Sequence, residues 1–322
     1  MAIVCACGTA AALTAAPVEQ TPAERADKVL ADARAAMGGA KLASVKTVVA
    51  SGRTQRVRGN NLVPIEFEIF LELPDKYLRA DESPFEETDP TSSGFNGDNL
   101  IQFPAAPAMP AGPMPGRPAP PAGAMPGGRG PAPDPRRARV TSLKQEFARL
   151  WLGMFASSPA AYPLTFSWAA IAQAPQGQAD VLDVKGDGNF AVRLFIDSKT
   201  HLPLMVSWTT PPTNVMITVP GQAAPKTVAP GAVVVQGPPA PPADAPKDAM
   251  DAYAKEVLAL RTKAQQTPVE HRLYFADYRD VDGVKFPFRL RRAIGSETTE
   301  ETTFDRFRLN TKIDPRKFEP VK

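Results

Sequence analysis

The strongest constraint on the fold lies near the C-terminus, where two alternating runs flank the dipeptide Asp282-Gly283. Residues 269–277 and 284–292 alternate, and their charged side chains fall between the apolar ones. The positions that share a face are Val269, His271, Leu273 and Phe275, then Val284, Phe286, Phe288 and Leu290. A period of two is typical of antiparallel strands that are wet on one side. Because Asp-Gly tolerates the positive φ of a type I′ turn, the sequence predicts a β-hairpin here.

The same alternation recurs along the chain and predicts a sheet of many strands. Residues 65–73 alternate most cleanly. Phe67, Ile69 and Leu71 share one face of this expected strand, and three glutamates lie on its other face. Further strands are expected over 44–57, 76–81, 164–171, 180–185, 189–196, 202–209 and 301–309, and near Phe95–Ile101 a turn entering a short strand. Within them, Phe190, Val192 and Leu194 share one apolar face, and Val206 and Trp208 share another. The chain is therefore mainly β.

Three segments carry helical spacing. Residues 22–37 follow a capping box formed by Thr21 and Glu24, and Gly38-Gly39 ends the pattern. A second helix is expected from a capping box at Ser142, and we expect its apolar stripe of Phe147, Leu150, Trp151 and Met154 to pack against the sheet. Residues 247–263 are a third candidate, with Met250, Tyr253, Val257 and Leu258 on one stripe.

The prolines are concentrated in two stretches. Of the 36 prolines, 12 lie in residues 104–135 and 10 in residues 211–246. Such composition buries too little apolar surface to offset the entropy of ordering. We expect a single domain, residues 21–322, interrupted by disordered insertions at 104–139 and 211–246. The insertions either have no function of their own or bind a partner through proline motifs.

Residues 1–20 resemble a signal peptide, because 2–16 are small, apolar and uncharged. Cleavage near 12–16 is the preferred interpretation, and it implies a secreted protein. A second interpretation is a lipoprotein signal around Cys5 and Cys7, and a third is a plain apolar tail. No later segment is long and apolar enough to span a membrane.

The composition argues against several kinds of chemistry. A net charge of +3 does not indicate a nucleic-acid surface. Both cysteines lie at the N-terminus, and His201 and His271 are the only histidines, so we expect neither a zinc site nor a thiol nucleophile. The aspartates around Asp280 are better explained by a turn than by calcium. We therefore expect no catalytic residues, no metal and no cofactor.

Several motifs together resemble the outer-membrane lipoprotein carrier superfamily, which includes LolA- and LolB-like proteins. They are the helix ending at Gly38-Gly39, Leu202-Pro203-Leu204, the run from Tyr278 to Pro287, and Asn310 followed by Ile313-Asp314-Pro315 and Phe318. The resemblance covers residues 22–103, 140–210 and 268–322, and the proline-rich stretches depart from it. It implies an unclosed, curved antiparallel β-barrel of about 10–11 strands with helices over the concave face.

The resemblance also implies a location in the periplasm or at the outer membrane. The function that it implies is binding of lipid acyl chains or lipoproteins without catalysis. The expected groove residues are Phe67, Ile69, Leu71, Phe190, Val192, Leu194, Val206, Trp208, Leu273, Phe275, Phe286 and Phe288. The expected lid residues are Phe147, Leu150, Trp151 and Met154. Three alternatives stay open: these positions form an ordinary core, the protein is an envelope sensor that binds a protein partner, or it is an uncharacterised enzyme. We expect a monomer.

Overall fold

The computed structural model describes residues 20–59, 61–84, 90–104, 134–221, 228–242 and 244–319. Nearly all of the signal-like segment 1–20 therefore lies outside the described residues. The same holds for residues 105–133, which make up most of the first expected insertion.

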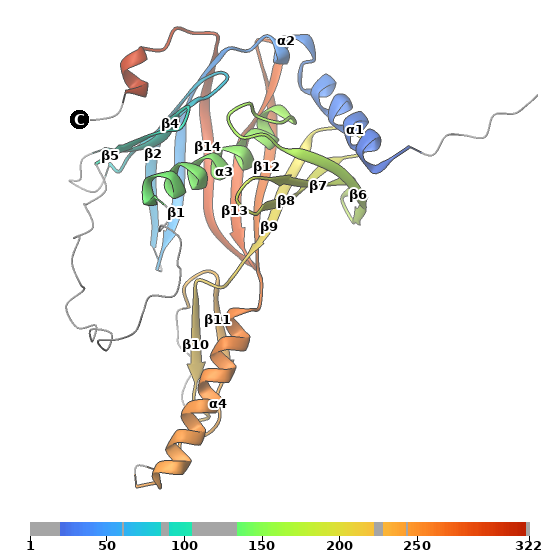
Figure 1. Ribbon diagram of the computed structural model, residues 1–322. Coiled ribbons are helices and arrows are strands. Elements are labelled where there is room, and N and C mark those ends of the chain that lie inside the picture. Colours follow the sequence, from blue (N-terminus) through green and yellow to red (C-terminus); the bar gives the residue numbers. More distant parts are fainter. Residues whose placement is uncertain are drawn as a thin grey trace, which may run out of the picture.

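A 12-stranded antiparallel sheet forms the body of the protein, and it is curved and not closed (Figure 1). Its strand order is β5-β4-β3-β2-β1-β14-β13-β12-β9-β8-β7-β6, so β5 and β6 are its edges. The strands are β1 (Thr47–Arg58), β2 (Asn61–Glu72), β3 (Lys76–Glu82), β4 (Thr91–Asn96), β5 (Asn99–Phe103), β6 (Thr165–Ala174), β7 (Gly177–Gly186), β8 (Phe190–Asp197), β9 (Pro203–Thr210), β12 (Val269–Val281), β13 (Val284–Ile294) and β14 (Glu297–Leu309). The unclosed antiparallel fold expected from the sequence is confirmed. The strand count is slightly higher than expected, because residues 91–103 form a complete hairpin rather than one short strand.

The β-hairpin predicted around Asp282-Gly283 is present. Strands β12 and β13 pair in antiparallel register, with Val281 opposite Val284. Asp282 and Gly283 between them have φ of 55° and 84°, as a type I′ turn requires. Asp280 accepts a hydrogen bond from the Gly283 amide at 2.8 Å, which supports the turn explanation for these aspartates.

Two helices lie on the concave side of the sheet (Figure 1). Helix α1 (Pro22–Met37) begins with the predicted capping box at Thr21 and buries Ala26, Leu30, Ala33 and Met37 near β6. Helix α3 (Pro135–Phe155) crosses the sheet from the β4–β5 hairpin to β9. The short helix α2 (Ala40–Ala43) links α1 to β1. None of the described helices is long and apolar enough to cross a membrane.

Helix α3 begins seven residues before Ser142, where the sequence predicts its start. Asp134 is the N-cap and Pro135 the first helical residue, so the expected capping box at Ser142 is wrong. The Asp134 side chain accepts from the Arg136 amide at 2.9 Å, and Pro135 needs no amide partner at this position. Residues 135–139, assigned to the first insertion, therefore belong to the helix.

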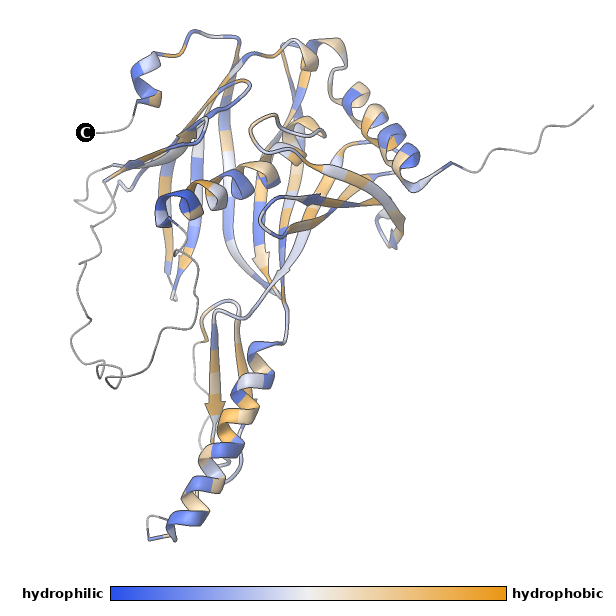
Figure 2. Cartoon of the chain, viewed as in Figure 1, coloured by the Kyte–Doolittle hydropathy of each residue, from blue (hydrophilic) through white to orange (hydrophobic). Residues whose placement is uncertain are grey.

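The second proline-rich stretch also contains regular structure. Strands β10 (Asn214–Thr218) and β11 (Ala232–Gln236) form a separate parallel pair, so the expectation of disorder over 211–246 is wrong for these residues. Helix α4 (Lys247–Gln265) packs on this pair, and the unit projects from the end of the barrel (Figure 1). Both strands and the middle of the helix are apolar (Figure 2).

The apolar stripe of α4 differs from the one expected. Tyr253, Val257 and Leu260 are half-buried and Ala264 is buried, at the spacing of one helix face. Met250 and Leu258 are 46% and 64% exposed, so assigning them to the packed stripe was wrong.

Two apolar clusters stabilise the sheet from opposite faces. The larger fills the concave side between the sheet, α1 and α3. The smaller lies on the other side and includes Phe70, Ile101 and Phe318, the last from the C-terminal 3-10 turn η1 (Pro315–Phe318). Because β-strand side chains alternate between faces, Phe70 belongs to this cluster while Ile69 and Leu71 belong to the larger one.

Candidate functional site

All of the predicted groove residues come together on the concave face. They line one continuous apolar surface that runs from β2 across β13 and β12 to β8. Each of them is buried, and Phe147, Trp151 and Met154 of α3 are buried against them, with Leu150 half-buried. In this structure the predicted groove is therefore a packed layer, and α3 covers the residues that were predicted to line it.

Aromatic rings form the contact between α3 and the sheet. Phe147 lies 5.1 Å from Tyr77, and Phe155 lies 5.9 Å from Phe286, measured between ring centroids. Trp151 stacks on Phe155 at 4.0 Å within the helix. The side of α3 that faces the sheet is thus a row of large apolar side chains, and it includes Phe147 and Trp151.

Gly153 allows α3 to lie close to the sheet. A Cβ at this position would fall 2.0 Å from Cε1 of Phe275, well inside any real carbon contact. The Gly153 carbonyl also accepts from the Tyr278 hydroxyl at 3.0 Å, and the same hydroxyl lies 2.9 Å from the Pro203 carbonyl. Burial raises the pKa of Tyr278 well above its ordinary value of 10, so the hydroxyl stays protonated and can donate.

Polar contacts fasten α3 around its rim. Lys144 Nζ lies 2.6 Å from Asp98 Oδ1 in the β4–β5 turn, and Asp98 is almost fully exposed. Gln145 Nε2 donates to the carbonyl of Gly188 at 3.2 Å in the β7–β8 turn. Exposed contacts of this kind contribute roughly 0–1 kcal/mol each, so the apolar layer holds the helix more strongly than they do.

A charged cluster lies where α3 meets β9 and β13. Glu146 of α3 accepts from Arg149 Nη1 at 2.6 Å and from Arg292 Nη2 of β13 at 3.1 Å. In the sequence, Arg292 looks like a cross-strand charge of the wet face, together with Arg289 and Arg291, and this interpretation is wrong for Arg292. Its position in β13 puts it on the same face as Phe286 and Phe288, two or three steps further along the strand.

Arg149 is the most buried member of this cluster. It is 9% exposed, and its guanidinium lies 4.4 Å from the Trp208 ring centroid and 5.2 Å from that of Phe190. Its Nε has no hydrogen-bond partner among the described residues. Burial lowers the pKa of Arg149, but a guanidinium stays protonated in proteins. Sequence reasoning missed this residue, because a single arginine in an amphipathic helix looks like an exposed charge.

His271 lies beside the cluster on the concave face, as its place in the alternation predicts. Its ring stacks on Trp208 at 5.3 Å, and its Nε2 lies 2.9 Å from Thr210 Oγ1. Burial lowers the pKa of His271, and the positive charges of Arg292 and Arg149 lower it further. His201 is elsewhere, half-buried in the turn between β8 and β9.

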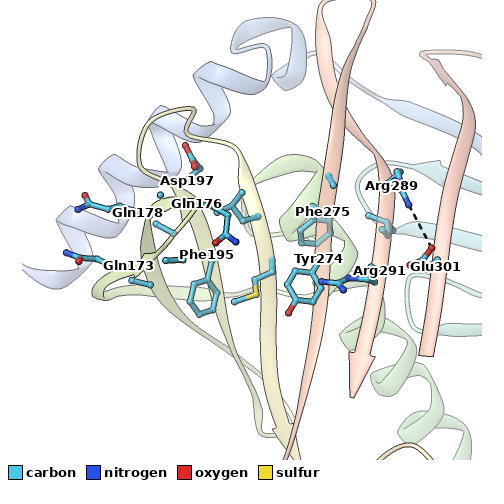
Figure 3. A pocket seen from close by; sticks show the side chains of 18 residues that line it. Gln173, Gln176, Gln178, Phe195, Asp197, Tyr274, Phe275, Arg289, Arg291 and Glu301 are labelled. Carbon is cyan, nitrogen blue, oxygen red and sulfur yellow. Dashed lines mark ion pairs between the residues drawn. The ribbon is translucent and has the colours of Figure 1, made fainter. Parts of the chain in front are cut away.

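A cavity of about 800 Å³ lies on the opposite, outer face of the sheet (Figure 3). A register row of Phe195, Met205, Tyr274, Arg291 and Glu301 crosses it from β8 to β14. The tip of the β6–β7 hairpin lines one end. Sequence reasoning missed this hollow, although Phe195, Met205 and Tyr274 interrupt an otherwise polar face and could have indicated it.

The described residues contain no group of three or more His, Cys, Asp or Glu side chains that could hold a metal ion. Elsewhere on the concave face, Arg79 pairs with Asp81 and Arg56 pairs with Glu300. The charged cluster of α3, β12 and β13 consists of one carboxylate, two guanidinium groups and one imidazole. Their arrangement is suited to holding an anion next to an apolar surface.

Comparison with known proteins yields structural likeness. No family model matches the chain, and no curated protein matches it. Among solved structures, the chain is similar in fold to a LolA superfamily protein, a lipoprotein-sorting protein domain and a DUF1329 family protein. A LolA superfamily protein from Nitrosomonas europaea shares 11% identity at a TM-score of 0.46, with 91% of this chain and 97% of that one covered. An outer-membrane lipoprotein-sorting protein domain from Vibrio parahaemolyticus shares 10% at 0.42, covering 91% and 97%. A DUF1329 family protein from Desulfovibrio piger shares 8% at 0.42, covering 93% and 98%.

Proposed function

We propose that this protein is a non-enzymatic component of the cell envelope that binds the acyl chain of a lipid or lipidated ligand between α3 and the concave face of the sheet. The observation that carries the proposal is the continuous apolar surface beneath α3, which one helix with a polar rim covers. If α3 moves outward, that surface becomes a groove lined by the residues predicted from the sequence.

The free energy lost when α3 leaves the sheet is comparable to the free energy gained when an acyl chain takes its place. Burying Phe147, Trp151 and Met154 contributes about 1.5–3 kcal/mol each, or roughly 5–9 kcal/mol together. An acyl chain contributes about 0.8 kcal/mol per buried methylene, so ten methylenes supply about 8 kcal/mol and only balance the loss. Sixteen supply about 13 kcal/mol, leaving roughly 4–8 kcal/mol and a Kd between millimolar and micromolar. A long chain should therefore displace α3, whereas a chain of ten carbons or fewer should bind poorly.

Tryptophan fluorescence provides a direct test, because the chain contains three tryptophans in different places. Trp151 lies on α3 and Trp208 beneath it, whereas Trp168 lies on edge strand β6 under Arg25 of α1. Bromine on an acyl chain quenches tryptophans that it touches. In variants that keep one tryptophan each, brominated hexadecanoate should quench Trp151 more strongly than Trp168, and brominated decanoate should quench neither at the same concentration.

The control variant is Met205→Glu, which alters the outer cavity and leaves the concave face unchanged. Binding that survives this change and quenches Trp151 supports the proposal. Binding that disappears with it, without quenching of Trp151, would move the site to the outer cavity.

Native mass spectrometry of protein purified from its own envelope should also show a co-purifying lipid. Protein that is empty and binds no brominated chain at micromolar concentration would refute the proposal.

A second candidate function is that of an envelope sensor or interaction module with a protein partner. The projecting β10–β11–α4 unit favours it, since Val234, Met250 and Leu258 are 41%, 46% and 64% exposed. Deleting residues 212–266 and joining β9 to β12 by a short linker separates the two functions. An acyl binder should retain its ligand, whereas an interaction module should lose its partner.

A further inference from the structure

The charged cluster beneath α3 contains more positive than negative charge. Glu146 is the shared carboxylate of Arg149 and Arg292. Glu300 lies opposite Arg292 in the sheet, but its carboxylate pairs with Arg56 at 3.1 Å. His271 adds no negative charge, and its lowered pKa keeps it neutral near pH 7. Among the described residues, one guanidinium charge of this cluster thus lacks a carboxylate of its own.

This excess charge is placed where it is costly. Arg149 is buried against Trp208 and Phe190, and its Nε has no partner among the described residues. The faces of aromatic rings offset part of the cost of burying a cation, but they do not satisfy an N–H donor. A buried cation without full pairing is unfavourable, and an anion that pairs with it removes part of this cost.

Glu146 holds a position that a ligand's head group can take. Its carboxylate is bound between two guanidinium groups, the geometry that carboxylates and phosphates share with arginine. Arg292 belongs to the sheet, whereas Glu146 and Arg149 belong to α3. When α3 moves away, Arg292 stays at the edge of the apolar surface and loses its partner.

We infer that the ligand is an anionic amphiphile, and that its carboxylate or phosphate replaces Glu146 on Arg292 as its acyl chain replaces α3. This inference rests on the proposed function and adds the chemistry of the head group. The Glu146–Arg292 pair is then a latch that an anionic ligand opens by competition. A neutral acyl compound must break the same latch without compensation.

Two substitutions that break the same ion pair separate this inference from a purely structural latch. Glu146→Gln frees Arg292, and Arg292→Gln removes it. If the pair only fastens α3, both variants should change the binding of every acyl compound alike. If Arg292 receives the head group, the variants should diverge for anionic compounds.

The experiment measures the affinities of hexadecanoate, hexadecyl phosphate and hexadecanol by displacement of the brominated probe. The natural chain should bind the better of the two anions at least about tenfold more tightly than the alcohol, as expected for a charge-assisted contact. Glu146→Gln should keep or increase this preference. Arg292→Gln should reduce it to about one, and Arg292→Lys should lie between, because lysine keeps the charge without the planar fork. Comparing the two anions shows whether the site prefers carboxylate or phosphate.

Arg289→Gln is the matched control, since Arg289 lies on the same strand, faces the outer cavity and pairs with Glu301 at 3.9 Å. It should leave the preference unchanged. Equal binding of anions and alcohol by the natural chain would overturn the inference while leaving the proposed function intact. The same holds for equal effects of Glu146→Gln and Arg292→Gln. Binding of none of the three compounds would overturn both.

Discussion

Gly153→Ala should weaken the contact between α3 and the sheet. The new Cβ would lie 2.0 Å from Cε1 of Phe275 and 2.3 Å from both Cδ1 and Cζ. Carbon atoms pack at about 3.5–4.0 Å, so either the helix or the ring must shift by roughly 1.5 Å. Phe275 is 4% exposed within the concave core, and its ring has little room to turn. We therefore expect the end of α3 to move away from the sheet.

Three terms set the magnitude. Overpacking a core costs about 1–3 kcal/mol. Weakening the hydrogen bond from Tyr278 to the Gly153 carbonyl costs about 0.5–1.5 kcal/mol more. Alanine returns about 0.8–1 kcal/mol through its better helix propensity. The clash outweighs the propensity gain, so the free energy of unfolding should fall by about 0.5–4 kcal/mol.

Urea denaturation followed by circular dichroism measures this change. Ala138→Gly, at an exposed position near the start of α3, is the control, and it should cost about 0.5–1 kcal/mol from propensity alone. Phe275→Leu in the Gly153→Ala background should recover part of the loss, because leucine leaves space for the new methyl group. Gly153→Ala should also bind the brominated chain more tightly. A variant as stable as the natural chain would refute the close packing described here.

Two further predictions concern polar groups near α3. Tyr278→Phe should lower the free energy of unfolding by about 1 kcal/mol or more, measured by urea denaturation, because the carbonyls of Gly153 and Pro203 lose their shared donor; an unchanged stability would contradict this contact. Because the pKa of His271 is lowered in the folded chain, the unfolded chain binds a proton more readily. The contribution of His271 to stability is therefore present above the unfolded pKa of about 6.5 and is lost as pH falls below that value. The stability difference between the natural chain and His271→Gln should therefore shift against the natural chain as pH falls below about 6.5, and a difference independent of pH would contradict the lowered pKa.

Local pattern in the sequence was enough for most strands of the large sheet and for their inward faces. Alternation placed Phe67, Leu194 and Phe286 on one face, and the structure buries all three in the same cluster. Asp282-Gly283 and the Thr21 capping box were predicted because turn and cap geometry depend on a few neighbouring residues. Asp134-Pro135 carried an equally local helix start, but the adjoining proline-rich composition obscured it.

The tertiary structure decided which of these pieces meet. The alternation in β1 does not specify β14 as its neighbour, nor does that in β9 specify β12, because strand pairing depends on contacts across long stretches of chain. The same is true of the ion pair between Glu146 and Arg292, which are 146 residues apart in sequence. The outer cavity likewise depends on the curvature of the whole sheet.

The sequence by itself determined an antiparallel sheet with an apolar concave face, since a period of two is a property of each strand alone. Whether that face is an open groove or a packed layer was decided by α3, whose Gly153 permits a close approach to Phe275. A helix settles on such a surface when the volumes of the facing side chains fit together, and that fit depends on distant residues brought together only in the folded chain.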